Sequence, residues 1–147
     1  MAVNFIKYAE EAHEYIKKMA LQLGFTEERT LRAVRAVLHA IRDRIGVGES
    51  LNLISQFPFF LKGLYVERWK LSERVENFST LDEFAERIMA GAGRTFVVDF
   101  ESKEQAVGVS RAVMHSLRRY VSEGELANVY KNLPKELKAI YNPEINV

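Results

Sequence analysis

The chain of 147 residues contains 48% hydrophobic and 28% charged residues, a composition typical of a folded globular protein. Its formal net charge of +1 provides no global field that would steer it toward nucleic acid or an acidic membrane. The absence of cysteine excludes disulfides, thiolate metal sites and cysteine nucleophiles, and it fits a reducing cytoplasm. No stretch approaches the roughly 18 apolar residues of a membrane span, and charges interrupt the N-terminus every few residues. We therefore expect a cytoplasmic protein without a membrane partner.

Apolar residues at helical spacing dominate the first half of the chain. The expected helices cover residues 5–23, 26–45 and 49–56, followed by one that starts at Pro58. Gly24 ends the first helix, Thr26 is the expected cap of the second, and Gly46 breaks the helical pattern after it.

The second half follows the same plan with clearer caps. The expected helices cover residues 81–89, 103–121 and 123–131, followed by one that starts at Pro134. Three capping boxes pair a serine or threonine with a glutamate or glutamine three residues later. They are Thr80 with Glu83, Ser102 with Gln105, and Ser122 with Glu125.

Residues 94–100 depart from this helical plan. They alternate in polarity and are rich in β-branched and aromatic side chains, which predicts a strand. A single strand has no partner for its backbone groups within the chain. We interpret the segment as an extended loop packed on the helices. The alternative is an edge that pairs with another chain, although folded proteins normally protect such edges.

An internal repeat relates the two halves. Residues 35–65 align with residues 111–141 without a gap, at a constant offset of 76 residues. Twelve of the 31 aligned positions are identical, whereas average composition predicts about two. We therefore predict an all-α fold, an internally duplicated helical bundle of two tandem four-helix units with a pseudo-twofold relation. Residues 1–147 would form a single compact domain, in which residues 66–80 connect repeats at about 5–65 and 81–141.

Most of the identical positions have an expected structural role. Gly48 and Gly124 are predicted to begin the short helix of each half, where a side chain would crowd the tight turn. Glu49 and Glu125 follow them in the first helical turn, where a carboxylate complements the exposed N–H groups.

A polar trio that recurs in both halves is the first candidate site. Its members are Arg35, His39 and Arg42 in the first half, and Arg111, His115 and Arg118 in the second. The spacing puts each trio within an arc of about 60° on its helix, beside the apolar stripe. Two guanidinium groups and an imidazole would suit phosphate or the nucleic-acid backbone. We favour the other interpretation, a boundary stripe whose arginine stems cover apolar neighbours and pair with the other half of the chain, because charge on a helix face is usually solvated.

The densest aromatic cluster is the second candidate site. It is a predicted interaction surface that consists of Phe57, Phe59, Phe60 and Trp69. The positions that match Phe59 and Phe60 in the second half are Lys135 and Glu136. The first half is therefore expected to bury a face that the second half leaves in water. That face would pack against the connector or against a partner chain.

The sequence contains no recognisable catalytic or cofactor motif, so no catalytic residue, cofactor or metal site is predicted. Residues 90–93 lack the glycine spacing and the strand–helix context of a phosphate-binding loop. His39 and His115 would meet if they lay across a pseudo-twofold axis, but no HxxxH or HxxE spacing supports metal ligation.

Several landmarks resemble those of a known family. They are Arg35–Leu38 leading to Gly48-Glu49, Gln56–Tyr65 followed by Trp69, and Leu133-Pro134. In this order they resemble a widespread uncharacterised prokaryotic family, domain of unknown function 2267, over nearly the whole chain. The resemblance implies a small, all-helical, soluble bacterial protein, and it implies no activity.

These observations predict a non-enzymatic helical module for interaction with a protein partner or for self-association. The alternative is a nucleic-acid or anion-binding accessory protein that uses the polar trios, which the near-neutral net charge disfavours. The third hypothesis is a small-ligand binder or enzyme with a site between the repeats, near His39 and His115.

Overall fold

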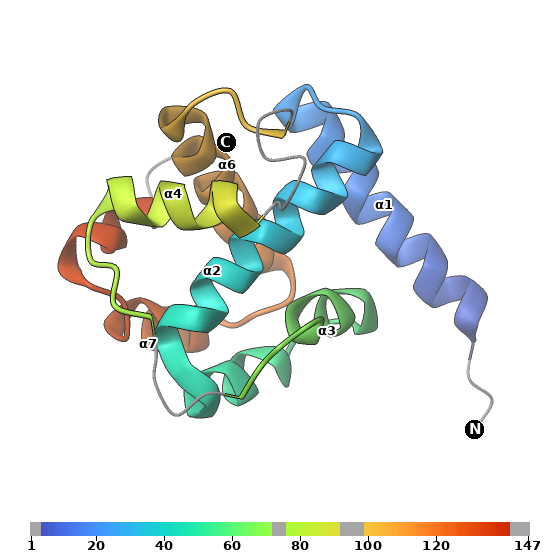
Figure 1. Ribbon diagram of the computed structural model, residues 1–147. Coiled ribbons are helices and arrows are strands. Elements are labelled where there is room, and N and C mark those ends of the chain that lie inside the picture. Colours follow the sequence, from blue (N-terminus) through green and yellow to red (C-terminus); the bar gives the residue numbers. More distant parts are fainter. Residues whose placement is uncertain (1–3, 72–75, 92–98, 142–147) are drawn as a thin grey trace.

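The fold is all-helical, as predicted (Figure 1). The computed structural model describes residues 4–71, 76–91 and 99–141, and these ranges contain no strand. None of the helices within these ranges is long and apolar enough to span a lipid bilayer. Residues 94–98 of the predicted strand (residues 94–100) lie outside the described residues.

The observed helices follow the predicted order. They are α1 (Phe5–Leu23), α2 (Glu27–Ile54), α3 (Phe59–Val66), α4 (Leu81–Gly91), α6 (Lys103–Ser116), the 3₁₀ turn η2 (Leu117–Arg119), α7 (Glu123–Lys131) and the 3₁₀ helix η3 (Lys135–Ile140). One predicted helix was wrong at its end, and another is a 3₁₀ helix. The helix expected over residues 103–121 ends at Ser116 and continues as η2, and the short helix after Pro134 is η3. Helices tighten in this way where too few residues remain for a further α-turn.

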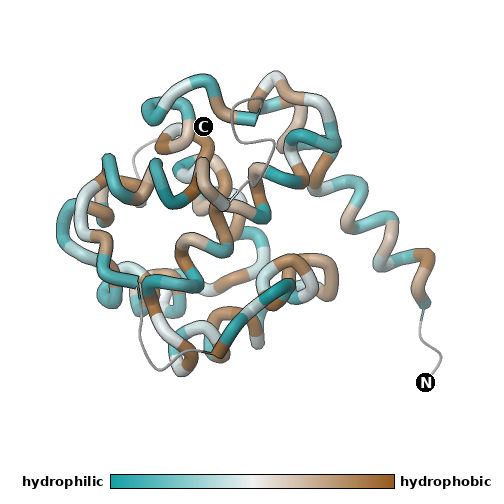
Figure 2. The backbone as a smooth tube through the Cα atoms, in the orientation of Figure 1, coloured by the Kyte–Doolittle hydropathy of each residue, from teal (hydrophilic) through white to brown (hydrophobic). Residues whose placement is uncertain are grey.

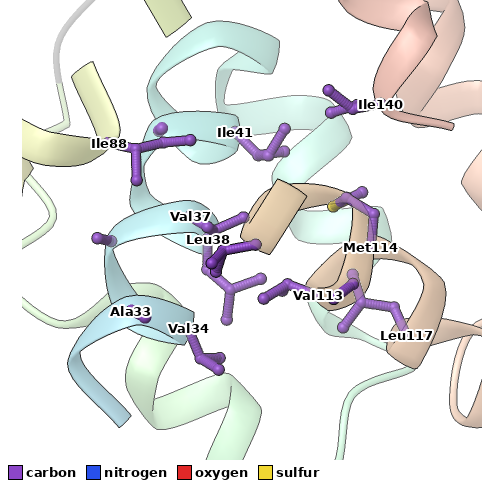
Figure 3. Close-up of a cluster of buried hydrophobic side chains, with 14 of the residues drawn as sticks. Ala33, Val34, Val37, Leu38, Ile41, Ile88, Val113, Met114, Leu117 and Ile140 are labelled. Atoms are coloured by element: carbon purple, nitrogen blue, oxygen red, sulfur yellow. The ribbon is translucent and has the colours of Figure 1, made fainter. Parts of the chain in front are cut away.

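Helix α2 runs through the middle of the molecule (Figure 1). It contacts α1, α3, α4, α6 and α7. Its side chains Val37, Leu38 and Ile41 are fully buried and lie beside Val113 and Met114 of α6 (Figure 3). Burial of each such side chain contributes about 1.5–3 kcal/mol relative to exposure. The core is therefore organised around one helix, to which the others attach.

A kink at Gly46 bends α2 where the sequence predicts a break. Gly46 has φ 85° and ψ 174°, a conformation that only glycine adopts readily. The prediction that a side chain would crowd the turn at Gly48 and Gly124 was wrong. A Cβ atom built at either position meets no atom within 4 Å apart from its chain neighbours and the backbone of its own helix. The backbone conformation at Gly46 requires glycine, whereas the space at Gly48 does not.

The three predicted capping boxes form to different extents. Thr80 and Glu83 make both reciprocal bonds, with the Thr80 hydroxyl accepting from Glu83 N at 3.1 Å and Glu83 Oε1 accepting from Thr80 N at 3.3 Å. Ser102 caps its helix, but the Gln105 side chain accepts from Glu101 N instead.

The third capping box forms only one of its two bonds. The Ser122 hydroxyl accepts from Glu125 N at 3.2 Å, as predicted. The Ser122 N–H donates at 2.8 Å to Gln56 of the first half, so the Glu125 carboxyl does not occupy the capping position. The Glu125 carboxyl is instead a neighbour of the Glu49 carboxyl.

The described end of the predicted strand is anchored to α2. Asp99 and Phe100 are buried, and the Asp99 carboxylate accepts two bonds of 2.9 Å from the Arg32 guanidinium. The Asp99 carbonyl also accepts from Arg29 Nε at 2.8 Å. This bidentate pair ties the chain before α6 to the start of α2.

Candidate functional site

The first polar trio secures the C-terminal end of α3. His39 Nε2 donates to the Leu64 carbonyl at 2.6 Å, and Arg42 Nη1 donates to the carbonyls of Tyr65 and Glu67 at 2.8 and 2.9 Å. The last carbonyls of a helix lack partners within it and carry partial negative charge, so these donors stabilise α3. Arg42 is buried and serves as a structural residue.

Burial keeps His39 neutral in this arrangement. It lowers the pKa of His39 more than the bond to the Leu64 carbonyl raises it. Arg35 also points to this helix end, because its Nη1 lies 3.4 Å from the Glu67 carboxylate. The first trio is thus engaged in structural contacts, but its partners, residues 64–67, lie in the same half of the chain and not in the other half, where they were predicted.

The second polar trio makes fewer bonds within the described residues. Arg111 Nε donates to the Ala139 carbonyl in η3 at 3.3 Å. His115 is half-buried, and Arg118 is exposed with its Nη2 3.6 Å from the Glu123 carboxylate. His115 and Arg118 line a pocket instead of holding a helix end.

We call this cavity the basic pocket; it lies between α1 and the corner formed by α6, η2 and α7. Its volume is about 540 Å³, within the range of small-molecule sites. The rim carries the basic side chains Lys18, His115, Arg118 and Arg119. The structure thus adds Lys18 and Arg119 to two of the predicted residues. His39 is not among the residues that line the pocket, so the two histidines do not share this site.

The floor of the basic pocket is closed by a chain of hydrogen bonds. The Ser116 hydroxyl donates to the Val113 carbonyl, and the Tyr15 hydroxyl lies 2.6 Å from Ser116 Oγ. Because the proton of Ser116 is engaged, Tyr15 is the donor in this second bond. Burial raises the pKa of Tyr15, so it keeps its proton. Neither hydroxyl proton is available to a ligand or poised for transfer.

Three of the four predicted aromatic surface residues pack against the core. Phe57 is buried, with its ring 5.8 Å from that of Tyr65. Phe60 is half-buried near Tyr15. Trp69 is half-buried with its ring 5.9 Å from that of Tyr65. The structure does not bring these residues together on one exposed surface.

Phe59 is the member of the aromatic set that faces solvent. It is 57% exposed, and its ring packs edge-on against Tyr8 of α1 with centroids 4.6 Å apart. Phe5, one turn before Tyr8, is 75% exposed. We call the surface formed by Phe5, Tyr8, Ala12 and Phe59 the α1–α3 face.

A buried carboxyl pair was missed by the sequence interpretation. Glu125 is 8% exposed, and its carboxyl group is a neighbour of that of Glu49, with Glu125 Oε1 and Glu49 Oε2 both buried and without another hydrogen-bond partner. Burial, followed by the Glu49 carboxyl, raises the pKa of Glu125 to about 7, so the pair shares a proton at lower pH. Asn132 Nδ2 donates to Glu49 Oε1 at 2.9 Å. The sequence contained a signal for this pair, since Glu49 and Glu125 occupy matching positions of the two aligned segments.

The described residues contain no group of three or more histidine, aspartate or glutamate side chains placed to hold a metal ion. The fold and its surfaces define a small all-helical protein with two candidate sites, the basic pocket and the α1–α3 face. A family model described as uncharacterized conserved protein (DUF2267) matches residues 12–140, and the chain belongs to this family. None of the curated proteins matches the chain.

Proposed function

We propose that this protein is a non-enzymatic interaction module that associates with a second copy of itself through the α1–α3 face. The observation that carries the proposal is the exposure of Phe59, whose ring rests on Tyr8 instead of entering the core. Large aromatic side chains are enriched at the centres of protein interfaces, because each removes much apolar area from water.

The main reason to expect that another molecule covers the α1–α3 face comes from helix α1. Apolar residues recur along one side of the whole helix, and in its C-terminal half Tyr15, Ile16 and Met19 are buried. In its N-terminal half the same side carries Phe5, which remains in water. Figure 1 shows this half extending away from the other helices, and Figure 2 shows hydrophobic residues near its start. A helical stretch this short is marginal in water without packing.

The charges on α1 favour a second copy as the occupant. On its polar side, Lys7, Lys17 and Lys18 are balanced by Glu10, Glu11 and Glu14. A helix with this balance around its apolar side does not repel its own copy, and it offers no excess charge to select a strongly acidic or basic partner. Closed twofold dimers, in which the same patch meets itself, are also the commonest oligomers.

We further propose that the chain is an internal duplication of two tandem four-helix units and acts in the cytoplasm of a prokaryote. The repeat places Gly46, at the kink of α2, opposite Ser122, the cap of α7. Both residues lie where a long helical segment gives way to a short one. This correspondence supports the duplication beyond the identities of sequence.

The interface is tested by the double substitution Phe5→Glu with Phe59→Glu. Both side chains are exposed, so the variant should retain the helical content of the wild type. Placing charges in a self-complementary apolar contact should weaken self-association by at least about tenfold. Sedimentation velocity over a series of protein concentrations measures the dimer constant directly.

Leu21→Glu is the matched control, because Leu21 is 77% exposed on the opposite side of the same helix. This variant should dimerise like the wild type. A wild-type chain that stays monomeric at all concentrations, or equal weakening by Leu21→Glu, would contradict the proposed interface. Binding of a different protein at the same face would replace the second copy as the occupant.

A further inference from the structure

We propose that the basic pocket is a binding site for the phosphate group of a small molecule. The proposal does not depend on self-association, because the pocket and the α1–α3 face use different residues. It assigns the pocket a ligand class, a phosphate monoester or a short polyphosphate.

The charge of the rim selects an anion. Lys18, Arg118 and Arg119 provide three permanent cations, while Glu123 provides one carboxylate. The permanent charges of the lining residues therefore sum to +2, which matches a dianionic phosphate group once Lys18 exchanges its pair with Glu14, outside the lining, for the ligand. Guanidinium groups bind phosphate oxygens through paired, charge-assisted hydrogen bonds.

The existing ion pairs at the rim are easily exchanged for a ligand. Arg118 lies 3.6 Å from Glu123, whose side chain is 82% exposed, and Lys18 lies 3.3 Å from Glu14 within one helix. Exposed pairs of this kind contribute little free energy. Arg119 has no ion pair within the described part of the chain, so its guanidinium group is available to an incoming anion.

The floor of the pocket supports recognition at the rim and does not compete with it. Tyr15 and Met19 are buried beneath the rim, and both face the cavity from α1. The Tyr15 hydroxyl donates to Ser116 Oγ, and the Ser116 hydroxyl donates to the Val113 carbonyl. Side-chain donors to the ligand therefore come from the cationic side chains, the His115 ring and the Gln22 amide, while the floor contacts the rest of the molecule.

The contrast between the two polar trios strengthens the assignment. Arg42 donates to the carbonyls that end α3 and is buried, so it cannot reach a ligand. Its counterpart in the repeat, Arg118, has no carbonyl partner among the described residues and lines the cavity. The same residue type at matching positions is thus structural in one half and accessible in the other.

The test is a titration of the full chain with inorganic pyrophosphate, followed by amide chemical shifts and by calorimetry. Shifts are expected at residues 115–119 and at residues 15–22 of α1. Arg118→Gln with Arg119→Gln should weaken binding by at least about tenfold, because it removes two charge-assisted contacts from exposed positions. Lys131→Gln with Lys135→Gln removes equal charge from exposed positions outside the pocket and should leave binding unchanged.

Two further probes distinguish the ligand classes. Citrate carries several carboxylates without phosphorus, and a short DNA duplex carries phosphates on an extended backbone. Weaker binding of both than of pyrophosphate supports the assignment. Absence of pyrophosphate shifts in the pocket, equal weakening by the two double variants, or tighter binding of the duplex would each overturn it.

Discussion

The Glu49–Glu125 pair shows how one residue can acquire a second role through tertiary contact. Glu125 lies in the first turn of α7, where a carboxylate is expected to cap the helix. The Ser122 N–H is instead bonded to Gln56, and the Glu125 carboxyl turns toward Glu49. Two neighbouring carboxyl groups repel each other when both are ionised, so this contact favours the state in which one of them is protonated.

This pair makes stability depend on pH in a defined direction. The pKa of Glu125 is raised in the folded state from an ordinary value of 4.5 to about 7. Between these values the folded protein binds more protons than the unfolded chain, so the pair's contribution is full below pH 4.5 and is lost as pH rises through 7. The loss amounts to about 1–3 kcal/mol, at about 1.4 kcal/mol per unit of pKa.

Glu125→Gln should remove this dependence, because the neutral amide still bonds to Glu49. Urea unfolding at pH 5 and pH 8, taken as the difference between variant and wild type, measures the effect. Glu104→Gln, at an exposed carboxylate of α6, is the control and should follow the wild type. A wild-type pH slope that survives Glu125→Gln would show that the two carboxyls do not share a proton.

At the scale of the element, the kink in α2 determines where the second half of this helix lies. Ser50 and Leu53 follow the kink, and both are fully buried. The Ser50 hydroxyl is 2.7 Å from that of Tyr65 in α3. A straight α2 would carry these side chains to other positions, so the fold depends on the backbone conformation of Gly46.

Gly46→Ala should therefore destabilise the protein by about 1–3 kcal/mol, the usual cost of a strained positive φ for a residue with a side chain. Gly48→Ala should be neutral or stabilise it by up to about 1 kcal/mol, since alanine favours helix and no atom obstructs its Cβ. Urea unfolding of both variants gives the comparison. A stabilising Gly46→Ala would contradict the role assigned to the kink.

Local rules predicted the helices well, because their signals lie within a few residues. Gly24 in the left-handed region and Thr26 as a cap have the predicted roles, and α3 begins at Phe59, one residue after the predicted start at Pro58. The rules failed where the outcome depends on distant contacts. The partner of Glu125 and the exposure of Phe59 are determined by packing between helices far apart in the sequence.

The candidate site could be predicted only in part for the same reason. His115 and Arg118 share one helical region, so their spacing alone identified them. Lys18 joins them through the packing of α1 against α6, which no local pattern reports. The repeat also suggested equal roles for both trios, whereas α3 requires the donors of only one.

For the whole molecule, the central place of α2 implies a single cooperative unit. Every major helix other than α2 packs against it, so loss of α2 would expose most of the core. The N-terminal half of α1 is the exception, because its apolar side does not enter that core.

Amide hydrogen exchange should therefore be slow in α2 and fast in the N-terminal half of α1. Amides around Val37 and Ile41 should exchange only through global unfolding, while amides between Tyr8 and Ala12 should exchange much faster. Mass spectrometry at low protein concentration, where self-association is minimal, measures both. Similar protection of the two segments would contradict this division.

The different roles of the two polar trios also affect which positions can change during evolution. Substitution of Arg42 removes donors from buried carbonyls, so selection for folding constrains that position. Arg118 and Arg119 are exposed and hold no helix end within the described residues. Folding therefore leaves the rim of the basic pocket free to change while the scaffold beneath it stays the same.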